Sequence, residues 1–211
     1  MRRGIIVAVE GFDGSGKSTL VKLLVEELAN YEVKVVQTRQ PGGTPYAEKI
    51  RDLLMSGDRD RSQAVEAHLF LAARQDLCDK LVAPAVEEGA IVVCDRHYLS
   101  SLANQPQCRS LFLENRVFDP DVWIMARCPF PVCIQRSEQR GDDDAFSNDE
   151  LREKRAQYDR YQHGIKDILP FTAGDSLFTV DTDLGLTSAR EQIKKVASYL
   201  VSLNKQLPYN S

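Results

Sequence analysis

Nine consecutive residues carry the clearest chemical pattern in the sequence. Residues 11–18 match G-x-x-x-x-G-K-[ST] in full and Thr19 follows them, directly after an apolar run and at the start of a helical pattern. Glycines let successive backbone N–H groups converge on phosphate oxygens, and the helix N-terminus adds partial positive charge. The lysine reaches the β and γ phosphates, and Ser18 supplies a hydroxyl to Mg²⁺. The expected nucleotide-binding residues are Gly11, Phe12, Asp13, Gly14, Ser15, Gly16, Lys17, Ser18 and Thr19.

A second cluster of charged residues follows another apolar run. Ile91–Cys94 is followed by Asp95-Arg96-His97, where a motor-type ATPase would carry Asp-Glu to activate water. An aspartate can hold Mg²⁺ through water, whereas an arginine offers charge to a second phosphate. A GTPase would need Asn-Lys-x-Asp, and the single Asn-Lys pair, Asn204-Lys205, is followed by Gln206-Leu207. The pattern therefore favours phosphoryl transfer to a bound acceptor over hydrolysis or guanine binding.

The elements that must position these residues belong to one domain. The chain has 211 residues, 43% of them hydrophobic, which is enough for a full core without disulfides. Five apolar runs predict strands at 5–10, 33–37, 90–94, 121–126 and 176–180. Helical periodicity predicts helices at 17–30, 45–56, 63–88, 107–117, 131–140, 149–168 and 187–203. Because strands and helices alternate, we expect an α/β fold spanning 1–211, with a central five-stranded parallel sheet covered by helices on both faces.

Composition limits where the protein acts and what it binds. Lys and Arg number 27 against 31 Asp and Glu, and a net charge of −4 disfavours a protein that wraps duplex nucleic acid. No stretch of about 18 apolar residues is present, and the apolar run 5–9 ends at Glu10, too short for a signal peptide. The five cysteines form no Cys-x-x-Cys pair, so we expect neither a zinc site nor a disulfide framework. A cytoplasmic, membrane-free location is expected.

One stretch of unusual composition joins two predicted helices. Residues 140–150 are polar and acidic, and they include Asp142-Asp143-Asp144. A solvated loop capped into the next helix by Ser147 or Asn148 is one interpretation. A mobile lid over a phosphate site, spanning about 136–150, is the other.

Four further segments, with the phosphate-binding loop, resemble the thymidylate kinase family of nucleoside-monophosphate kinases. Thr38–Thr44 resembles the family's Arg-Glu-Pro-Gly-Gly-Thr segment, Phe70–Arg74 its Phe-x-Ala-Ala-Arg helix, and Asp95–Gln105 its Asp-Arg-[HY]-x-x-Ser-x-x-Ala-Tyr-Gln stretch. Pro120-Asp121 precedes the fourth predicted strand, so the resemblance runs from about 5 to 180. It implies a P-loop kinase fold, transfer of a phosphoryl group from ATP to dTMP with Mg²⁺, and a homodimer with small nucleotides as its partners.

The acceptor site can be argued from the same residues. Phe70 and Arg74 are four residues apart on one predicted helix and share a face, which suits a pyrimidine stacked on the ring with its O4 bound by the guanidinium. The alternative is that Phe70 belongs to the core and Arg74 forms a surface ion pair with Glu66 or Asp79. Arg39 and Arg96 follow the carboxyl ends of two predicted strands, where ligands bind in open α/β sheets.

Residue roles follow from the resemblance. The acceptor is a phosphate dianion, so catalysis needs alignment and charge neutralisation and no general base. The expected catalytic residues are Lys17, Asp95, Arg96, Arg140 and, behind it, Arg136; Ser18 and Asp95 are the expected Mg²⁺ ligands. The expected acceptor-binding residues are Asp13, Arg39, Pro41, Phe70, Arg74, Arg96, Ser100, Asn104 and Gln105.

The sequence departs from the family pattern at several positions. The variable loop positions 12–15 contain no basic residue, so the lid arginines Arg140 and Arg136 are the candidates for the family's catalytic arginine. Asn104 stands where relatives have Tyr or Phe, which predicts weaker sugar discrimination or an altered base; dUMP and 5-hydroxymethyl-dUMP are alternative acceptors. Gln40 replaces Glu, and Arg127-Cys128 stands where Asp is more usual. A P-loop switch without transfer activity and a kinase acting on DNA are less favoured hypotheses.

Overall fold

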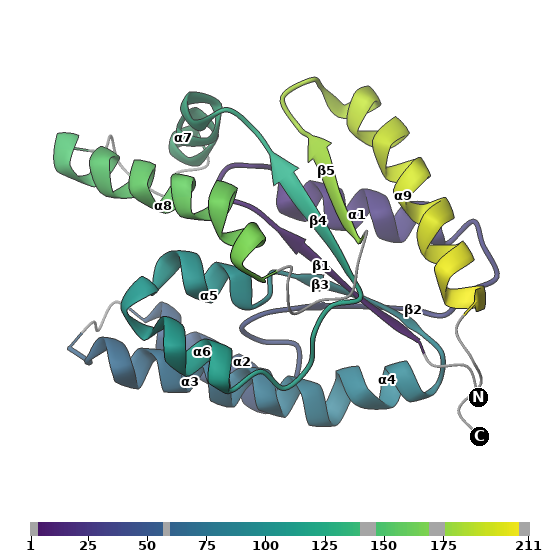
Figure 1. Ribbon diagram of the computed structural model, residues 1–211, viewed down its shortest axis with the longest axis horizontal. Coiled ribbons are helices and arrows are strands. Elements are labelled where there is room, and N and C mark those ends of the chain that lie inside the picture. Colours follow the sequence, from purple (N-terminus) through teal and green to yellow (C-terminus); the bar gives the residue numbers. More distant parts are fainter. Residues whose placement is uncertain (1–3, 57–59, 140–146, 169–175, 207–211) are drawn as a thin grey trace.

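The computed structural model describes residues 4–56, 60–139, 147–168 and 176–206 (Figure 1). Its single sheet has the strand order β2-β3-β1-β4-β5, and every neighbouring pair is parallel. The strands are β1 (Ile5–Glu10), β2 (Val35–Arg39), β3 (Ile91–Asp95), β4 (Val122–Arg127) and β5 (Leu177–Asp181). The predicted five-stranded parallel sheet is confirmed, and the four later strands lie one or two residues further along the chain than predicted.

Helices cover both faces of this sheet. They are α1 (Lys17–Leu28), α2 (Pro45–Met55), α3 (Gln63–Leu77), α4 (Ala83–Glu87), α5 (Tyr98–Asn104), α6 (Arg109–Glu114), α7 (Phe130–Gln139), α8 (Asn148–Ile168) and α9 (Leu186–Gln206). A π-helical turn, Cys78–Val82, joins α3 to α4, and a 3₁₀ turn, Pro106–Cys108, precedes α6. Across the described parts of the chain, no helix combines the length and apolar character needed to cross a membrane.

The alternation of side chains along β1 divides the core in two. Ile5, Val7 and Val9 pack with α1 and α9, while Ile6 and Ala8 point to the other face. Figure 1 shows α1 and α9 together on one side of the sheet, with α3, α4 and α5 on the other. The fully buried strand β1, which is apolar up to Glu10, is thus the centre of a three-layer α/β fold.

The two neighbouring strands β2 and β3 differ in burial. Residues 91–94 of β3 are completely buried, as an apolar strand inside a parallel sheet should be. Val35 and Val36 of β2 are only partly buried, although their apolar character predicts burial on both faces. The reason is position, because β2 forms the edge of the sheet.

Two helical segments differ from the sequence prediction. The helix predicted at 63–88 is divided by the π-helical turn, because Pro84 has no N–H and its ring clashes with the carbonyl four residues earlier. The helix α5 was not predicted at all. Its first turn has no side-chain cap of its own; instead Glu10, at the end of β1, accepts hydrogen bonds from the backbone N–H groups of His97 (2.7 Å) and Ser100 (3.0 Å).

The acidic stretch 140–150 is only partly described. Residues 140–146, which include Arg140 and the three aspartates, lie outside the described residues, so a lid there stays a prediction. At the start of α8, the Ser147 hydroxyl accepts a hydrogen bond from the Glu150 N–H, and the Glu150 carboxylate accepts one from the Ser147 N–H. This reciprocal capping box confirms Ser147 as the cap of the following helix.

Candidate active site

The phosphate-binding loop connects β1 to α1 and turns on left-handed glycines. Gly14 and Gly16 have φ angles of 75° and 87°, and a Cβ on Gly14 would lie 2.0 Å from the Cys133 carbonyl oxygen of α7. The loop therefore packs directly against α7. The Lys17 ammonium donates a hydrogen bond to the Phe12 carbonyl at 2.7 Å, which holds the side chain over the loop. The predicted order of strand, loop and helix is confirmed, and the contact of Lys17 with the β and γ phosphates stays a prediction.

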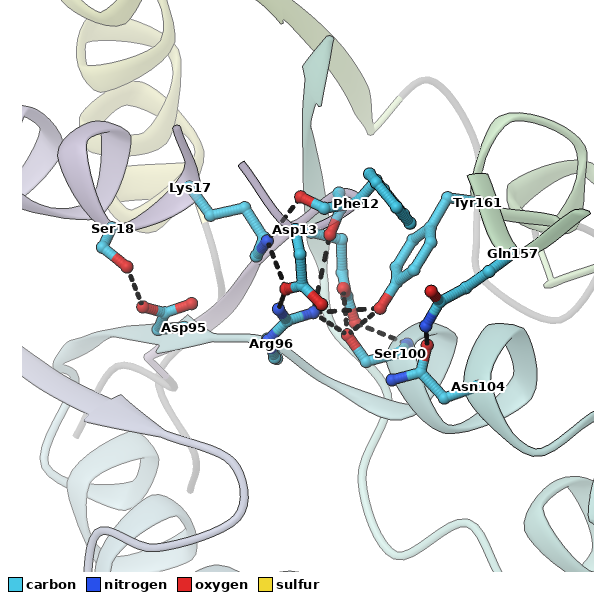
Figure 2. Close-up of polar contacts among 12 residues, drawn as sticks. Phe12, Asp13, Lys17, Ser18, Asp95, Arg96, Ser100, Asn104, Gln157 and Tyr161 are labelled. Carbon is cyan, nitrogen blue, oxygen red and sulfur yellow. Dashed lines mark hydrogen bonds and ion pairs between the residues drawn. The ribbon is translucent and has the colours of Figure 1, made fainter. Parts of the chain in front are cut away.

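Parallel strands bring the remaining charged residues to the same edge. Arg39 ends β2, Asp95 ends β3, and Arg96 follows it. The Ser18 hydroxyl donates a hydrogen bond to the Asp95 carboxylate at 3.0 Å (Figure 2). A hydroxyl and a carboxylate at this distance are the hard oxygen ligands that Mg²⁺ prefers beside substrate phosphates, so the pair fits the predicted metal site.

Arg96 is held on two sides by a dense set of partners. It is the one non-glycine residue with positive φ (71°) in the described part of the chain. Its Nη2 pairs with the Asp13 carboxylate, and its Nη1 donates to the hydroxyls of Ser100 (3.0 Å) and Tyr161 (2.9 Å) (Figure 2). Backbone strain held by surrounding contacts is a common feature of functional sites.

Beneath Arg96 lies a buried carboxylate that sequence reasoning missed. Glu10 is 0% exposed and, besides the two backbone N–H groups at the start of α5, accepts a hydrogen bond from the Ser100 hydroxyl at 2.7 Å. Burial raises the pKa of Glu10, outweighing the positive charge of Arg96 and the hydrogen bonds. The available signal was a carboxylate ending an otherwise fully apolar strand, which is rare without a partner.

Charges around the loop shift each other's pKa values. Burial, together with the positive charge of Arg96, lowers the pKa of Lys17 to about 8. Burial opposes ionisation of Asp13, yet the charges of Arg96 and Lys17 prevail and lower its pKa. Lys17 lies 3.7 Å from the Asp13 carboxylate. The Asp13 carboxylate thus lies between two cationic side chains that favour its ionised form.

A cavity of about 490 Å³ opens beside these residues. It is bounded by the phosphate-binding loop, the ends of β2 and β3, and side chains from α2 and α8. Sequence reasoning did not identify its Arg51, Met55, Ser137 and Lys154. The complete lining is Asp13, Gly14, Gly16, Lys17, Ser18, Thr19, Arg39, Gln40, Arg51, Met55, Asp95, Arg96, Ser137 and Lys154.

A second cavity, of about 390 Å³, shares the loop residues Gly14, Gly16 and Thr19 with the first. Its other wall residues belong to α1, the end of α7, the segment between β5 and α9, and the start of α9, and sequence reasoning connected only Arg136 among them with a site. They are Leu20, Arg136, Gln139, Thr182, Gly185, Leu186 and Ala189. The two cavities therefore meet at the phosphate-binding loop.

The base-binding pair predicted on α3 lies inside the protein. Arg74 is 3% exposed and donates hydrogen bonds to Gln40 (2.8 Å) and Ser101 (3.0 Å), so the expected alternative of a surface ion pair with Glu66 or Asp79 is wrong. Phe70 is half-buried and packs between two core clusters. The contact from Arg74 gives Gln40 a role that the sequence left unexplained.

Four other predicted acceptor residues form hydrogen bonds or an ion pair within the protein. Asn104 accepts a hydrogen bond from Gln157 of α8 at 2.6 Å, and Gln105 donates to Glu66 at 2.7 Å. The Pro41 carbonyl accepts from Arg51 at 3.1 Å. Arg39 is half-exposed and pairs with Glu48 at 2.7 Å. Of these four predicted acceptor residues, Pro41, Asn104 and Gln105 are not part of the lining of the larger cavity, whereas Arg39 is.

Two arginines that the sequence singled out, Arg136 of α7 and Arg127 of β4, bind different partners. Arg136 donates a hydrogen bond to the Thr182 carbonyl at 2.9 Å and lines the smaller cavity, away from Arg39. Its predicted contact with the transferred phosphoryl group stays a prediction. Arg127 forms a two-pronged ion pair with Asp181 at 2.5 and 2.9 Å, which joins the ends of β4 and β5. This pair explains the arginine that stands where an aspartate is more usual.

Comparisons with known proteins agree with this geometry. The family model described as thymidylate kinase matches residues 9–193. A thymidylate kinase of Gluconobacter oxydans is 41% identical over 150 residues, covering 66% of this chain and 70% of that protein. One of Caulobacter vibrioides is 33% identical over 206 residues, covering 93% and 97%. The crystal structure of thymidylate kinase from Ehrlichia chaffeensis superposes with a TM-score of 0.68 at 25% identity, covering 92% of this chain and 99% of that one. The chain therefore belongs to the thymidylate kinase family.

Proposed function

We propose that the protein transfers the γ-phosphoryl group of ATP to the phosphate of dTMP, giving ADP and dTDP. The observation that carries the proposal is the pair of cavities that meet at Gly14, Gly16 and Thr19 of the phosphate-binding loop. A donor in one cavity and an acceptor in the other would place both phosphate groups at this loop. The names of the relatives favour dTMP and do not favour dUMP or 5-hydroxymethyl-dUMP.

The smaller cavity suits the donor base. The flat Arg136 guanidinium and the apolar Leu186 side chain are among the residues that surround it, and a purine can stack on such groups. From there the triphosphate would extend across the backbone N–H groups of the loop toward Lys17. Ser18 and Asp95 would hold Mg²⁺, which neutralises phosphate charge and orients the donor when bound.

The larger cavity suits a nucleoside monophosphate. Arg39 and Arg96 provide guanidinium groups for the acceptor phosphate, while Arg51 and Lys154 add positive charge from α2 and α8. No group in the site has to remove a proton, because the attacking oxygen already belongs to a phosphate dianion. The chain's own contribution is to align the two phosphates and to balance the charge that builds up between them.

Buried polar atoms behind this cavity match the edge of a pyrimidine. Within the described residues, Arg74 Nη1, Gln40 Nε2 and Gln105 Oε1 are buried and have no hydrogen-bond partner. Such atoms are costly in a folded protein unless a ligand completes their bonds. The Arg74 N–H would donate to the base O4, and an amide oxygen such as that of Gln105 would accept from N3–H. Half-buried Phe70, one turn before Arg74 on α3, would supply the stacking surface.

An acceptor panel tests the proposal. Purified protein with Mg²⁺-ATP is assayed for ADP with dTMP, dUMP, 5-hydroxymethyl-dUMP, UMP or no acceptor. We expect ADP formation that depends on the acceptor and is fastest with dTMP. ADP release at the same rate without any acceptor would instead indicate a hydrolase or switch. The panel also tests the weaker sugar discrimination predicted from Asn104, through the ratio of kcat/KM for dTMP to that for UMP.

The cytoplasmic location expected from composition and the homodimer implied by the resemblance belong to the same proposal. A cytoplasmic enzyme would meet its nucleotide substrates at high concentration. A homodimer is supported by exposed apolar side chains at the α2–α3 pair: Leu53, Met55 and Val65 are each more than half exposed. Light scattering during size-exclusion chromatography would give twice the chain mass for a dimer, and a single chain mass would remove this part of the proposal.

A further inference from the structure

Tyr161 is a buried hydroxyl group for which the reaction described above gives no role. It lies on α8, the helix that follows the predicted lid segment, and is 1% exposed. Its hydroxyl lies between Arg96 Nη1 (2.9 Å) and the Ser100 hydroxyl (3.0 Å) (Figure 2). A side chain from α8 therefore reaches the arginine that bounds the acceptor cavity.

The direction of each hydrogen bond in this cluster is fixed by chemistry. An arginine only donates, so the Tyr161 oxygen accepts from Arg96 and uses its own proton for Ser100. The Ser100 hydroxyl in turn donates to the Glu10 carboxylate at 2.7 Å. Burial raises the pKa of Tyr161 to about 12, so its proton is retained at neutral pH. The chain of donors thus runs one way, from Arg96 to Glu10.

Tyr161 acts on one side of the Arg96 guanidinium only. Nη1 is held by Tyr161 and Ser100 and lies 3.5 Å from the Gly11 carbonyl oxygen, whereas Nη2 faces Asp13 at the wall of the acceptor cavity. The Arg96 side chain is 24% exposed, so part of the fork remains available to a ligand. Fixing Nη1 on the protein side decides which N–H groups point into the cavity.

The ring of Tyr161 also packs against a neighbouring side chain, and a substitution can retain this packing while it removes the hydroxyl. The ring packs edge-on against Phe12 with ring centroids 6.3 Å apart. A phenylalanine at position 161 keeps this ring and removes only the oxygen. Tyr158, one turn earlier on α8, also packs edge-on against Phe12, at 5.6 Å, but its hydroxyl donates to the Cys128 carbonyl, away from Arg96. Tyr158 is therefore a matched control.

We propose that the Tyr161 hydroxyl is a positioning group for Arg96, which couples the placement of α8 to the recognition of the acceptor phosphate. The proposal rests on the proposed function, because it assigns the acceptor phosphate to the cavity beside Asp13 and Arg96. Tyr161 does not touch the substrate itself; it restricts the guanidinium to the orientation in which the phosphate can be bound. Ser100 shares this task through the same nitrogen atom.

Steady-state kinetics with Tyr161→Phe and Tyr158→Phe separates positioning from packing. We expect Tyr161→Phe to lower kcat/KM for dTMP about tenfold, the value of a lost hydrogen bond to a charged group, while the KM for ATP stays within about twofold. Tyr158→Phe should leave both within about twofold. Ser100→Ala combined with Tyr161→Phe should cost less than the product of the single effects, because both hydroxyls bind Nη1. Equal losses in the two Tyr variants, or a loss shared by ATP and dTMP, would overturn the proposal.

A second measurement does not depend on turnover. In NMR spectra of ¹⁵N-arginine-labelled protein, Tyr161→Phe should speed hydrogen exchange or rotation of the Arg96 guanidinium, and Tyr158→Phe should not. An unchanged Arg96 signal in Tyr161→Phe would refute the positioning role, whatever the enzyme's activity. If the wild-type protein shows no dTMP-dependent ADP release while the Arg96 signal changes as expected, the proposed function fails and the contact between α8 and Arg96 stands.

Discussion

Arg96 is the one described non-glycine residue with a positive φ, and both terminal nitrogens of its side chain bind other protein groups. One guanidinium nitrogen is satisfied by protein hydroxyls and the other pairs with Asp13, while the backbone adopts a positive φ. A planar fork can make such contacts and still offer an N–H to a phosphate; a lysine, with its single compact ammonium, cannot. The residue type is therefore set by geometry as well as by charge.

The first prediction concerns this fork. Arg96→Lys retains the charge and the same backbone cost of positive φ, but it cannot contact Asp13, Tyr161 and the acceptor together. We expect kcat/KM for dTMP to fall about 10²- to 10³-fold, as when a donor to a developing anion is lost. Arg127→Lys is the control, because that arginine pairs with Asp181 away from both cavities at the loop. Near-normal kinetics in Arg96→Lys would remove the fork from the mechanism.

The second prediction concerns the proton on Lys17. Because burial and Arg96 lower its pKa to about 8, the free enzyme loses this positive charge as the pH rises above 8. We expect kcat/KM for ATP to decline above that pH, toward a tenfold fall per pH unit. Bound phosphates favour the charged ammonium, so the decline in kcat should begin at higher pH. A profile of kcat/KM for ATP that stays level up to pH 9.5 would contradict this account.

At the scale of elements, the strands of the sheet were predictable from the sequence. The hydrogen bonds between residues far apart in the chain, which hold the helices in place, were not. Apolar runs such as Ile91–Cys94 predicted every strand within two residues, because short β-branched segments leave a clear local signal even where a strand forms the partly buried edge of the sheet. The helix α5 left none, because its N-terminal N–H groups are capped by Glu10, almost ninety positions earlier in the chain. The contact of Tyr161 with Arg96 is likewise created by tertiary structure alone.

The third prediction concerns the packing of the loop against α7. Gly14→Ala would place a Cβ 2.0 Å from the Cys133 carbonyl oxygen in addition to adopting a positive φ. Gly185→Ala also has a positive φ, of 87°, but its Cβ would meet nothing within 4 Å. We expect Gly185→Ala to lower the free energy of unfolding by about 1–2 kcal/mol. Gly14→Ala should cost about 1–3 kcal/mol more, from overpacking. Equal costs in denaturant titrations would show that the loop does not need this close approach.

At the scale of the whole molecule, a net charge of −4 coexists with a cationic site. Parallel strands end at one edge, so Arg39 and Arg96 meet Lys17 there although they are far apart in the sequence. Composition excluded a broad basic surface but could not reveal this concentration of charge. The full outline of the cavity beside Arg136 was also unpredictable, because beyond the phosphate-binding loop its walls come from α7, the segment after β5 and the start of α9, which carry no recognisable motif.

The fourth prediction follows from the two cavities. A ligand that binds only the folded state stabilises it by about 2.7 kcal/mol at one hundred times its Kd. Mg²⁺-ATP and dTMP should therefore each raise the free energy of unfolding, and together they should raise it further than either alone. Stabilisation by ATP with none from dTMP would leave a nucleotide-binding protein without an acceptor site.

The central claim is direct transfer between two bound nucleotides. It is tested by incubating the protein with ATP labelled at the γ-phosphate, Mg²⁺ and dTMP, and by separating the products. The account predicts that the label appears in dTDP, in amounts equal to the ADP formed, and that Lys17→Ala abolishes the transfer while retaining the fold. Label released as inorganic phosphate regardless of dTMP, or no labelled dTDP at all, would contradict it.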